Sequence, residues 1–356
     1  MSQQIHKNKH LKTFDPVKAW VITSAQTGLI ESRRGEGTGE RRGAKFNNSM
    51  GSPYDGIILI DKNEGDSSFG VVKRVRRILK IRKVGHAGTL DPFATGLLIV
   101  LLGQGTKLSP YLMSGKKVYR ATLRLGVETD TLDPTGRVIQ TRPVPEFELD
   151  HIRKKAREFV GEIEQVPPIF SAVNYEGRRA YEFAREGIKI ELEKRKVTVH
   201  SLEIESADLP YVTMEVCCSS GTYVRSLAAS LGRELGPGAH LKSLRRLSSG
   251  SFTLKEALNL NEAELTSSDP TFRKRIIPLS DALPHMKEIP VDEGTAQRIR
   301  NGYQPNWEEL FKGSDMSDFH DDHVKVANGT ELVAIMSARY SLGDDRGSLR
   351  IKRVFN

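Results

Sequence analysis

One stretch of the chain, KVGHAGTLDPFATGLL at residues 83–98, holds residue types that could do covalent chemistry on a bound molecule. Asp91 is the one acidic side chain in this stretch, and three glycines would let a ligand approach the backbone closely. An ionised Asp91 could act as a nucleophile if a nearby arginine lowered its pKa and held it in place. His86 would offer a flat ring beside it. A structural role is the alternative, because an aspartate before a proline often forms an Asx turn or a cap.

Two elements that precede this loop must position it. The β-branched run DGIILIDK, residues 55–62, predicts a buried strand that ends at Lys62. Ser67 or Ser68 can then cap a helix that runs to about residue 81, because its apolar side chains recur at intervals of three and four. Between residues 67 and 90 there are seven lysines or arginines and no acid, so this helix presents either a solvated face or a phosphate-binding face. Its basic side chains include Arg74 and Arg77.

The remaining elements mix strands and helices without strict alternation. Two prolines stiffen an extended loop at 165–177. The pattern predicts an α+β fold with a mixed, largely antiparallel sheet. The expected strands are 117–126, which carries Tyr119, with 195–206 and 211–220; the expected helices are 105–113, 147–160, 177–186 and 222–235, the last carrying Tyr223 and Arg225.

The chain divides into three predicted regions. Residues 1–52 carry nine Lys or Arg against four Asp or Glu and little apolar surface, so we expect a disordered basic extension there. Met50 precedes the first strand, so the functional protein could also begin at that residue. Residues 53–288 are expected to form the main domain, including a linker from about residue 258. Residues 289–356 combine a helical piece with short β segments and predict a small β domain.

Composition excludes several classes of protein. The apolar run at 97–102 is far shorter than the roughly 20 residues of a transmembrane helix, and lysines interrupt every candidate signal sequence in the first fifty residues. We therefore expect a cytoplasmic protein with no membrane partner. The only cysteines, Cys217 and Cys218, are adjacent, which excludes a disulfide framework and a four-cysteine zinc site. A formal charge of +9 favours a polyanionic partner.

Two other motifs are weaker candidates for a functional site. GQGTK, residues 103–107, lacks the order and spacing of a phosphate-binding loop. DMSDFHDDH, residues 315–323, gathers carboxylates and two histidines, but we interpret it as an exposed acidic loop, because a hard-metal site needs a fixed geometry. We therefore predict no metal site.

Five motifs in a fixed order resemble the TruB family of tRNA pseudouridine synthases. The similarity covers about residues 55–303, and five ordered motifs are a more specific signal than any one of them alone. The motifs are GHAGTLDPFATGLL, KKVYRATLRLGVETDTLDPTG, VPPIFSAVNYEGRRAYEFAREG, CSSGTYVRSLAASLG and LKSLRRLSSGSF.

This resemblance implies roles for three side chains. Asp91 would be the catalytic carboxylate that acts on the ribose of the target nucleotide. Tyr119 would stack on the flipped uracil and take part in proton removal at C5, and Arg225 would form an ion pair with Asp91. From the residues alone, Tyr119 could instead be a core residue of its strand and Arg225 a charge on the surface of its helix.

The resemblance also implies a set of RNA-binding residues. His86 would sit against the RNA where the extruded base leaves its stack, and Tyr223 and Leu244 would line the pocket. Lys62 matches the family motif after the first strand, although Asn63 stands where the family has proline, and Asn174 replaces a usual lysine. From the basic run itself rather than from the resemblance, we expect Arg74 and Arg77 to contact phosphates of the RNA.

The implied activity is the isomerisation of uridine 55 in the T loop of tRNA to pseudouridine, on a pseudouridine synthase catalytic domain followed by a PUA-like domain. This reaction transfers no electrons and needs no cofactor. The implied partner is the T arm of tRNA, with no obligatory protein partner and a monomeric enzyme. Two alternatives stay open, namely a tRNA-folding chaperone and a synthase that depends on a guide RNA. The sequence also leaves open whether Asp91 adds to C1′ or removes the C2′ proton.

Overall fold

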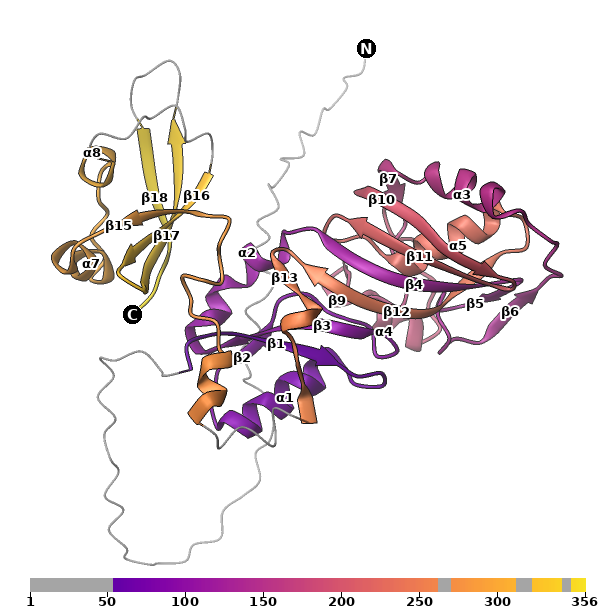
Figure 1. Ribbon diagram of the computed structural model, residues 1–356, viewed down its shortest axis with the longest axis horizontal. Coiled ribbons are helices and arrows are strands. Elements are labelled where there is room, and N and C mark those ends of the chain that lie inside the picture. Colours follow the sequence, from indigo (N-terminus) through magenta and orange to yellow (C-terminus); the bar gives the residue numbers. More distant parts are fainter. Residues whose placement is uncertain (1–53, 262–269, 312–321, 341–346) are drawn as a thin grey trace, which may run out of the picture. The chain divides into compact units, whose positions relative to one another are not determined.

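The computed structural model describes residues 54–261, 270–311, 322–340 and 347–356 of the chain. The predicted extension at residues 1–52 lies outside the described residues, as do positions 315–321 of the acidic motif. Within the described part of the chain, no helix is long and apolar enough to cross a membrane. Figure 1 shows the elements in chain order.

A ten-stranded mixed sheet forms the centre of the main region (Figure 1). Its main path runs in the order β14-β1-β3-β12-β4-β11-β10-β7, with β2 paired to β3 and β13 paired to β12. Only the β1–β14 and β3–β12 pairs are parallel. The predicted mixed, largely antiparallel sheet is thus confirmed. Its strands are β1 (Gly56–Lys62), β2 (Val84–His86), β3 (Thr95–Leu102), β4 (Lys117–Leu125), β7 (Gly161–Gln165), β10 (Arg195–Asp208), β11 (Tyr211–Cys218), β12 (Ala239–Ser249), β13 (Phe252–Thr253) and β14 (Leu258–Asn259).

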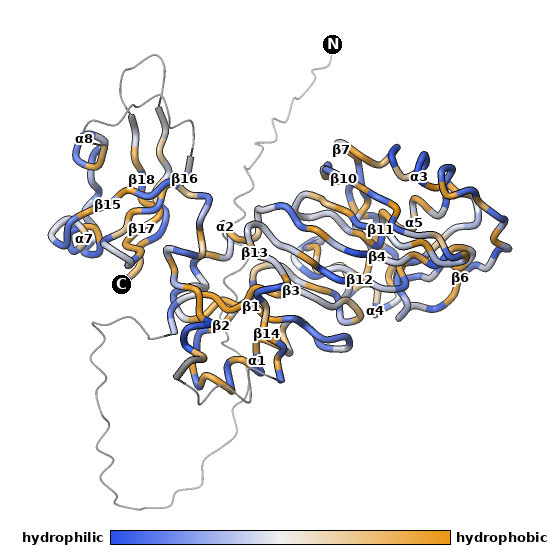
Figure 2. Tube along the Cα trace, in the orientation of Figure 1, coloured by the Kyte–Doolittle hydropathy of each residue, from blue (hydrophilic) through white to orange (hydrophobic). Residues whose placement is uncertain are grey.

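Strand β3 is buried on both of its faces. Leu97, Ile99 and Leu101 join one apolar core, and the alternate residues Leu98 and Val100 join another. Such a strand shows a continuous apolar run rather than alternation, and this is why the sequence does not distinguish it from a buried helix segment. The tube in Figure 2 is correspondingly hydrophobic along the neighbouring strand β1.

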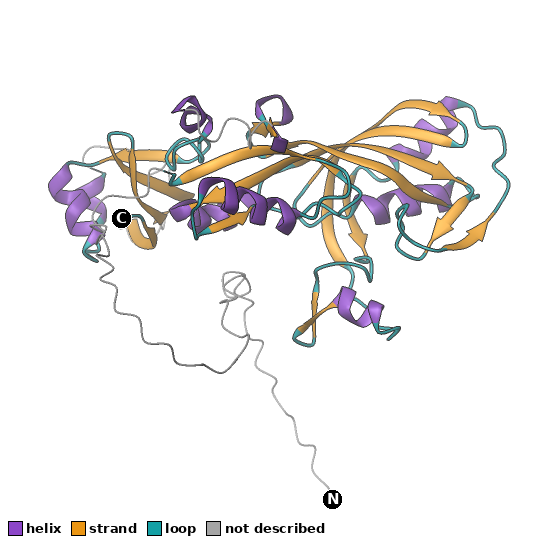
Figure 3. Ribbon diagram, turned by 90° about the horizontal axis from the view of Figure 1, so that it is seen from below, coloured by secondary structure: helices purple, strands orange, loops and turns teal. Residues whose placement is uncertain are grey.

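The helices and two small hairpins pack around this sheet. Helix α1 covers β1 and β3 through Val71, Val72, Val75 and Leu79. Helices α3 and α5 share a core with β4, β10, β11 and β12, and Figure 3 shows them along one face of the sheet. The bounds are α1 (Ser68–Leu79), η2 (Gly103–Leu108), α2 (Ser109–Met113), α3 (Leu149–Arg157), α4 (Ala180–Arg185), α5 (Val224–Glu234), η3 (Leu254–Glu256) and η4 (Pro270–Arg275), with hairpins β5–β6 (Val127–Thr129 and Val138–Thr141) and β8–β9 (Asn174–Tyr175 and Arg178–Arg179).

A separate four-stranded sheet follows, in the order β15-β16-β17-β18. Asp292 caps α7 by accepting a hydrogen bond from the Thr295 backbone, in agreement with the predicted helical piece. This sheet begins at Lys287, and the boundary expected at residues 288 and 289 stays a prediction. The elements are β15 (Lys287–Pro290), α7 (Glu293–Arg300), α8 (Trp307–Leu310), β16 (Asp322–Asn328), β17 (Glu331–Tyr340) and β18 (Gly347–Val354).

Candidate active site

Asp91 lies in the loop between β2 and β3, and the backbone on either side of it is fixed. The Ser68 hydroxyl, at the start of α1, donates to the Leu90 carbonyl at 3.0 Å and accepts from the Leu90 amide at 2.9 Å. On the other side, the Ala94 amide donates to the Asp91 carbonyl at 3.1 Å. The capping segment of α1 therefore holds the loop in place, as the order of these elements in the sequence suggested.

Lys62 joins the end of β1 to the same loop. Its ammonium group donates to the carbonyls of Asn63 at 2.9 Å, Asp66 at 2.7 Å and Pro92 at 3.2 Å. The side chain is buried, and burial lowers the pKa of Lys62 to about 8. A buried cation shared by three carbonyls connects the turn after β1 to the residue that follows Asp91.

Arg225, in the first turn of α5, meets Asp91 with two nitrogen atoms. Its Nε lies 3.0 Å from Oδ2 of Asp91, and its Nη2 donates to Oδ1 at 3.3 Å. Nη2 also donates to the Phe170 carbonyl at 2.9 Å, so the proline-stiffened loop at 165–177 contributes to the site. The side chain of Arg225 is 4% exposed and that of Asp91 is 34% exposed. The carboxylate is therefore held by a buried guanidinium while part of it faces solvent.

A second carboxylate, Asp133, shares the same guanidinium, and the sequence analysis did not identify it. Nη1 of Arg225 donates to Oδ2 of Asp133 at 3.2 Å and to the Thr131 carbonyl at 3.0 Å. Oδ1 of Asp133 accepts from the Thr131 hydroxyl at 2.7 Å, the Thr135 hydroxyl at 2.6 Å and the Thr135 amide at 2.9 Å. Asp133 belongs to the quoted stretch TDTLDPTG, where an aspartate before a proline indicates a turn; it gives no sign of the arginine.

The pKa of Asp91 is raised above its ordinary value. Burial is the largest cause, and the charge of Asp133 adds to it, whereas the charges of Arg225 and Lys62 lower the pKa in opposition. We expected the arginine to lower the pKa, and its contribution has that sign, but burial outweighs it.

Tyr119 and Arg246 lie opposite one another on the neighbouring strands β4 and β12. Arg246 is 1% exposed. Its Nε donates to the carbonyl of Leu97 in β3 at 2.6 Å, and its Nη2 donates at 3.2 Å to the carbonyl of Gly88, which lies in the loop before Asp91. Burial raises the pKa of Tyr119, and the charge of Arg246 opposes that rise, so its phenol is neutral at neutral pH.

Gly96 allows β3 and β12 to approach closely beside Arg246. A Cβ atom on Gly96 would lie 2.4 Å from the Arg246 carbonyl oxygen, and its φ of +99° is one that L side chains rarely adopt. Any larger residue there would push away the strand that carries both Leu244 and Arg246. Leu244 is buried in the core against which Tyr119 packs.

The other predicted residues divide into those near this cluster and those apart from it. His86 ends β2, and burial together with the charge of Arg246 lowers its pKa, which keeps the ring neutral at neutral pH. Tyr223 precedes α5, where its amide donates to Oε1 of Gln165 at 2.7 Å and its carbonyl accepts from Nε2 of Gln165 at 3.0 Å. Arg74 instead donates to Asn261 at 2.8 Å, and Arg77 is exposed on α1.

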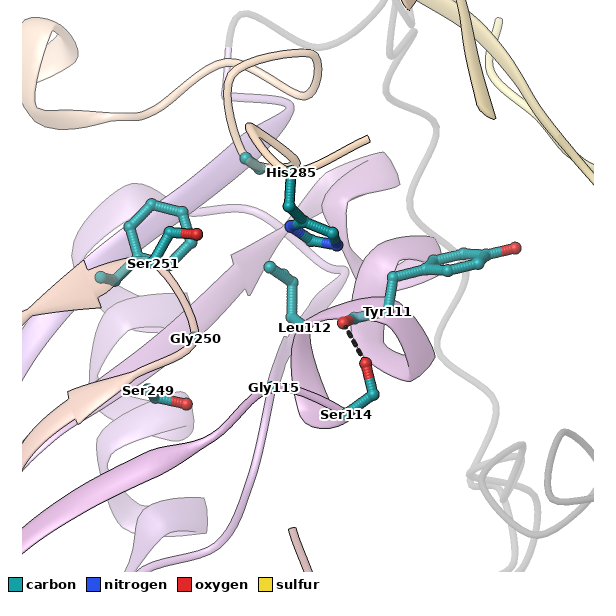
Figure 4. A pocket seen from close by; sticks show the side chains of 10 residues that line it. Tyr111, Leu112, Ser114, Gly115, Ser249, Gly250, Ser251 and His285 are labelled. Carbon is teal, nitrogen blue, oxygen red and sulfur yellow. Dashed lines mark hydrogen bonds between the residues drawn. The ribbon is translucent and has the colours of Figure 1, made fainter. Parts of the chain in front are cut away.

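Figure 4 shows a pocket of about 200 Å³, and none of the residues of the Asp91 cluster lines it. It is lined by the end of α2, the turn between β12 and β13, and the segment that contains Ala282 and His285. The described residues contain no cluster of three or more His, Cys, Asp or Glu side chains suited to a metal ion.

Solved structures share this fold over most of the chain. A Cbf5–Nop10–Gar1 complex matches with a TM-score of 0.66 and 26% identity, covering 85% of each chain. An archaeal box H/ACA sRNP Nop10–Cbf5 complex matches with a TM-score of 0.64 and 25% identity, covering 88% of this chain and 93% of the other. The chain therefore has the α+β fold of the Cbf5 subunit in these complexes.

Curated relatives match at higher identity. The tRNA pseudouridine synthase B of Geobacter sulfurreducens is 42% identical over 303 residues, which cover 85% of this chain and all of the relative. That of Syntrophus aciditrophicus is 43% identical over 315 residues, covering 85% of this chain and 99% of the relative. The model of the TruB family pseudouridylate synthase N-terminal domain matches residues 76–224. This chain belongs to the TruB family of pseudouridylate synthases.

Proposed function

We propose that this protein isomerises uridine 55 in the T loop of tRNA to pseudouridine, with Asp91 as the catalytic carboxylate. The observation that carries the proposal is the position of Asp91, which is partly exposed and held by two nitrogen atoms of the buried Arg225. Relatives that align over 85% of the chain are named tRNA pseudouridine synthase B.

The reaction breaks the bond between N1 and C1′, turns the uracil and joins C5 to C1′. C5 then loses its proton and N1 gains one, so no atom or electron is gained overall. An ionised Asp91 can serve either route, by adding to C1′ or by taking the C2′ proton. Arg225 keeps the carboxylate oriented in both routes, and its three other contacts hold the guanidinium itself in place.

We propose that Tyr119 acts on the base rather than on the sugar. Tyr119 lies beside Arg246, and the charge of Asp91 contributes to the rise in the pKa of Tyr119. A neutral phenol can stack on uracil. To accept the proton from C5, Tyr119 must first give its own proton to water or another base; the charge of Arg246 would stabilise the resulting phenolate, which becomes a phenol again when it takes the C5 proton.

The remaining predicted residues would bind the RNA around the flipped nucleotide. Extrusion of a base costs a few kcal/mol of stacking, which aromatic contacts and phosphate contacts can offset. The neutral ring of His86 would contact the RNA where the extruded base leaves its stack. Tyr223 and Leu244 would line the pocket that receives the uracil, and Arg74 and Arg77 would contact phosphates. Since a T-arm hairpin needs no guide, we further propose a monomeric cytoplasmic enzyme without an obligatory protein partner.

The experiment is a tritium-release assay on tRNA labelled at C5 of uridine, using the purified chain alone. We expect release from position 55, and a fall of about 10⁴-fold or more in the Asp91→Asn variant, with tRNA binding retained. Activity of that variant close to wild type would remove Asp91 from the proposed role. If it instead releases no tritium but still restores tRNA folding in cells, the chaperone activity is separable from the chemistry. Activity only with added protein or guide RNA would contradict the proposal of a stand-alone enzyme.

A further inference from the structure

The two faces of α1 differ sharply in character. Its buried side chains pack against β1 and β3. On the opposite face, three exposed side chains at positions i, i+4 and i+7 lie in one stripe along the helix, and a fourth exposed side chain follows at the C-cap, where the backbone is left-handed. Three of the four are cations, no acid occurs in α1, and the remaining one is a large aromatic ring. The members are Phe69, Lys73, Arg76 and Lys80.

Phe69 contributes nothing to the core of the protein. It is 56% exposed, the most exposed aromatic side chain among the large hydrophobic residues of the described chain. Nζ of Lys73 lies 4.8 Å from the centroid of the ring, which restrains its orientation by a cation–π contact. An exposed ring that is held in one orientation suits stacking, because little side-chain freedom is lost when a flat partner binds.

The position of Phe69 is fixed relative to Asp91. The preceding residue, Ser68, makes two hydrogen bonds to the backbone of Leu90, which precedes Asp91. Phe69 and Asp91 are each one residue away from this hydrogen-bonded pair, and consecutive Cα atoms are about 3.8 Å apart. The Cα atoms of Phe69 and Asp91 are therefore on the order of 14 Å apart or less. A few nucleotides of one RNA strand span this distance.

We propose that the ring of Phe69 is a stacking platform for an unpaired base of the bound RNA outside the catalytic pocket, and that Lys73, Arg76 and Lys80 contact the phosphates of the same strand. The proposal rests on the proposed function, which makes RNA the partner. Charge complementarity favours this occupant, since a strand of phosphates meets three cations and no acid along α1.

The test measures tRNA affinity of the wild type against Phe69→Ala, Phe69→Leu and Phe69→Trp at one fixed salt concentration. Loss of one stacked base weakens binding by about 5- to 150-fold, so we expect that loss in Phe69→Ala and most of it in Phe69→Leu. Phe69→Trp keeps a stacking surface and should bind at least as tightly as wild type. Thermal unfolding checks that the variants fold. We expect that they do, because the side chain of Phe69 is exposed.

Two further readouts separate stacking from charge. Phe69→Ala should leave the slope of log K against log salt unchanged, whereas the matched variant Lys73→Met should reduce its magnitude by about 1. A series of T arms would carry 2-aminopurine at successive unpaired positions. At one position, wild type and Phe69→Trp should quench the fluorescence, and Phe69→Ala should not.

Equal affinity of Phe69→Ala and wild type would overturn the proposal, as would equal losses in the alanine and tryptophan variants. Binding of wild type to vesicles of acidic lipid that Phe69→Ala loses, with tRNA binding unchanged, would assign the ring to a membrane surface instead. Because affinity does not depend on turnover, a chain that binds tRNA through Phe69 but forms no pseudouridine would contradict only the proposed function.

Discussion

The loop that carries Asp91 and the turn that carries Asp133 place one carboxylate each on the same guanidinium, yet the two carboxylates are held very differently. Asp133 is 6% exposed at the side chain and accepts three further hydrogen bonds from two threonines of its own turn. Asp91 is 34% exposed, and among the described residues Arg225 is the only one whose side chain donates a hydrogen bond to its carboxylate.

This difference separates anchoring from reactivity. A buried carboxylate that accepts four hydrogen bonds fixes the arginine but has little capacity to react. A carboxylate that keeps open acceptor sites, faces solvent and has a raised pKa is more basic and accessible to a ligand. These contacts support the proposed roles, in which Asp133 positions the arginine and Asp91 does the chemistry.

Removing the shared cation should have the largest effect. Arg225→Met leaves the buried Asp133 and the half-buried Asp91 without their common partner, so we expect a loss of about 3–5 kcal/mol of unfolding free energy and a fall of at least about 10²-fold in kcat/KM. Urea denaturation and tritium release measure the two quantities. The matched control is Arg233→Met, on the same helix, whose 58% exposed side chain pairs with Glu128 and should cost about 1 kcal/mol or less. Equal losses in the two variants would contradict the central role of Arg225.

Exchanging each carboxylate for its amide should distinguish the two loops. Asp133→Asn presents an amide to buried donors and should cost about 1–3 kcal/mol of unfolding free energy. Asp91→Asn removes a desolvated charge and its repulsion from Asp133, so its stability should stay within about 1 kcal/mol of wild type or rise. Urea midpoints in the reverse order would show that Asp91, rather than Asp133, anchors the arginine.

The pH dependence of kcat/KM should sharpen the same contrast. In the proposed mechanism Asp91 must be ionised, and its pKa is raised, so the rate should fall on acidification at a pH above the ordinary range of an aspartate. The negative charge of Asp133 contributes to that rise, and therefore Asp133→Asn should move the acid limb to lower pH. Lys62→Met removes a charge that lowers the pKa of Asp91 and should move the limb to higher pH. Shifts of the same sign in both variants would contradict this assignment of charges.

The smallest expected effect concerns the basic helix. If Arg74 and Arg77 contact phosphates, Arg77→Gln should reduce the magnitude of the slope of log K against log salt by about 1. Arg74→Gln should reduce it less, because Arg74 is already hydrogen-bonded to Asn261. Fluorescence titration of tRNA between low and moderate salt measures both slopes. A change in which uridine is modified would show that these side chains read sequence rather than phosphates.

The sequence predicted much of this arrangement because several signals were local. A β-branched run indicated β1, serine capping and apolar spacing indicated α1, and the motif around Asp91 marked the reactive loop. The contact between Asp91 and Arg225 spans 134 residues and followed only from the family resemblance.

Asp133 and Arg246 were missed for a physical reason. In the local sequence, Asp133 is an ordinary aspartate in a turn and Arg246 an ordinary charge on a strand. Their roles depend on burial against distant segments of the chain. Arg246 is covered because Gly96 lets its strand come close, and no spacing rule in the sequence reports such an approach. Strand β3 was not predicted as a strand because its apolar run consists mainly of leucines, which suit a helix or a strand, whereas the isoleucines of β1 favour a strand.

The side-chain amide of Gln165 pairs with the backbone of Tyr223 as a residue of an adjacent β-strand would. It donates one hydrogen bond to the Tyr223 carbonyl and accepts one from the Tyr223 amide. In the loop that follows β7, the Phe170 carbonyl accepts a hydrogen bond from Arg225 of α5. The last residue of β7 and the residue before α5 are therefore joined by a pair of hydrogen bonds from the one side chain of Gln165. Any shift of α5 relative to β7 would have to break both of these bonds.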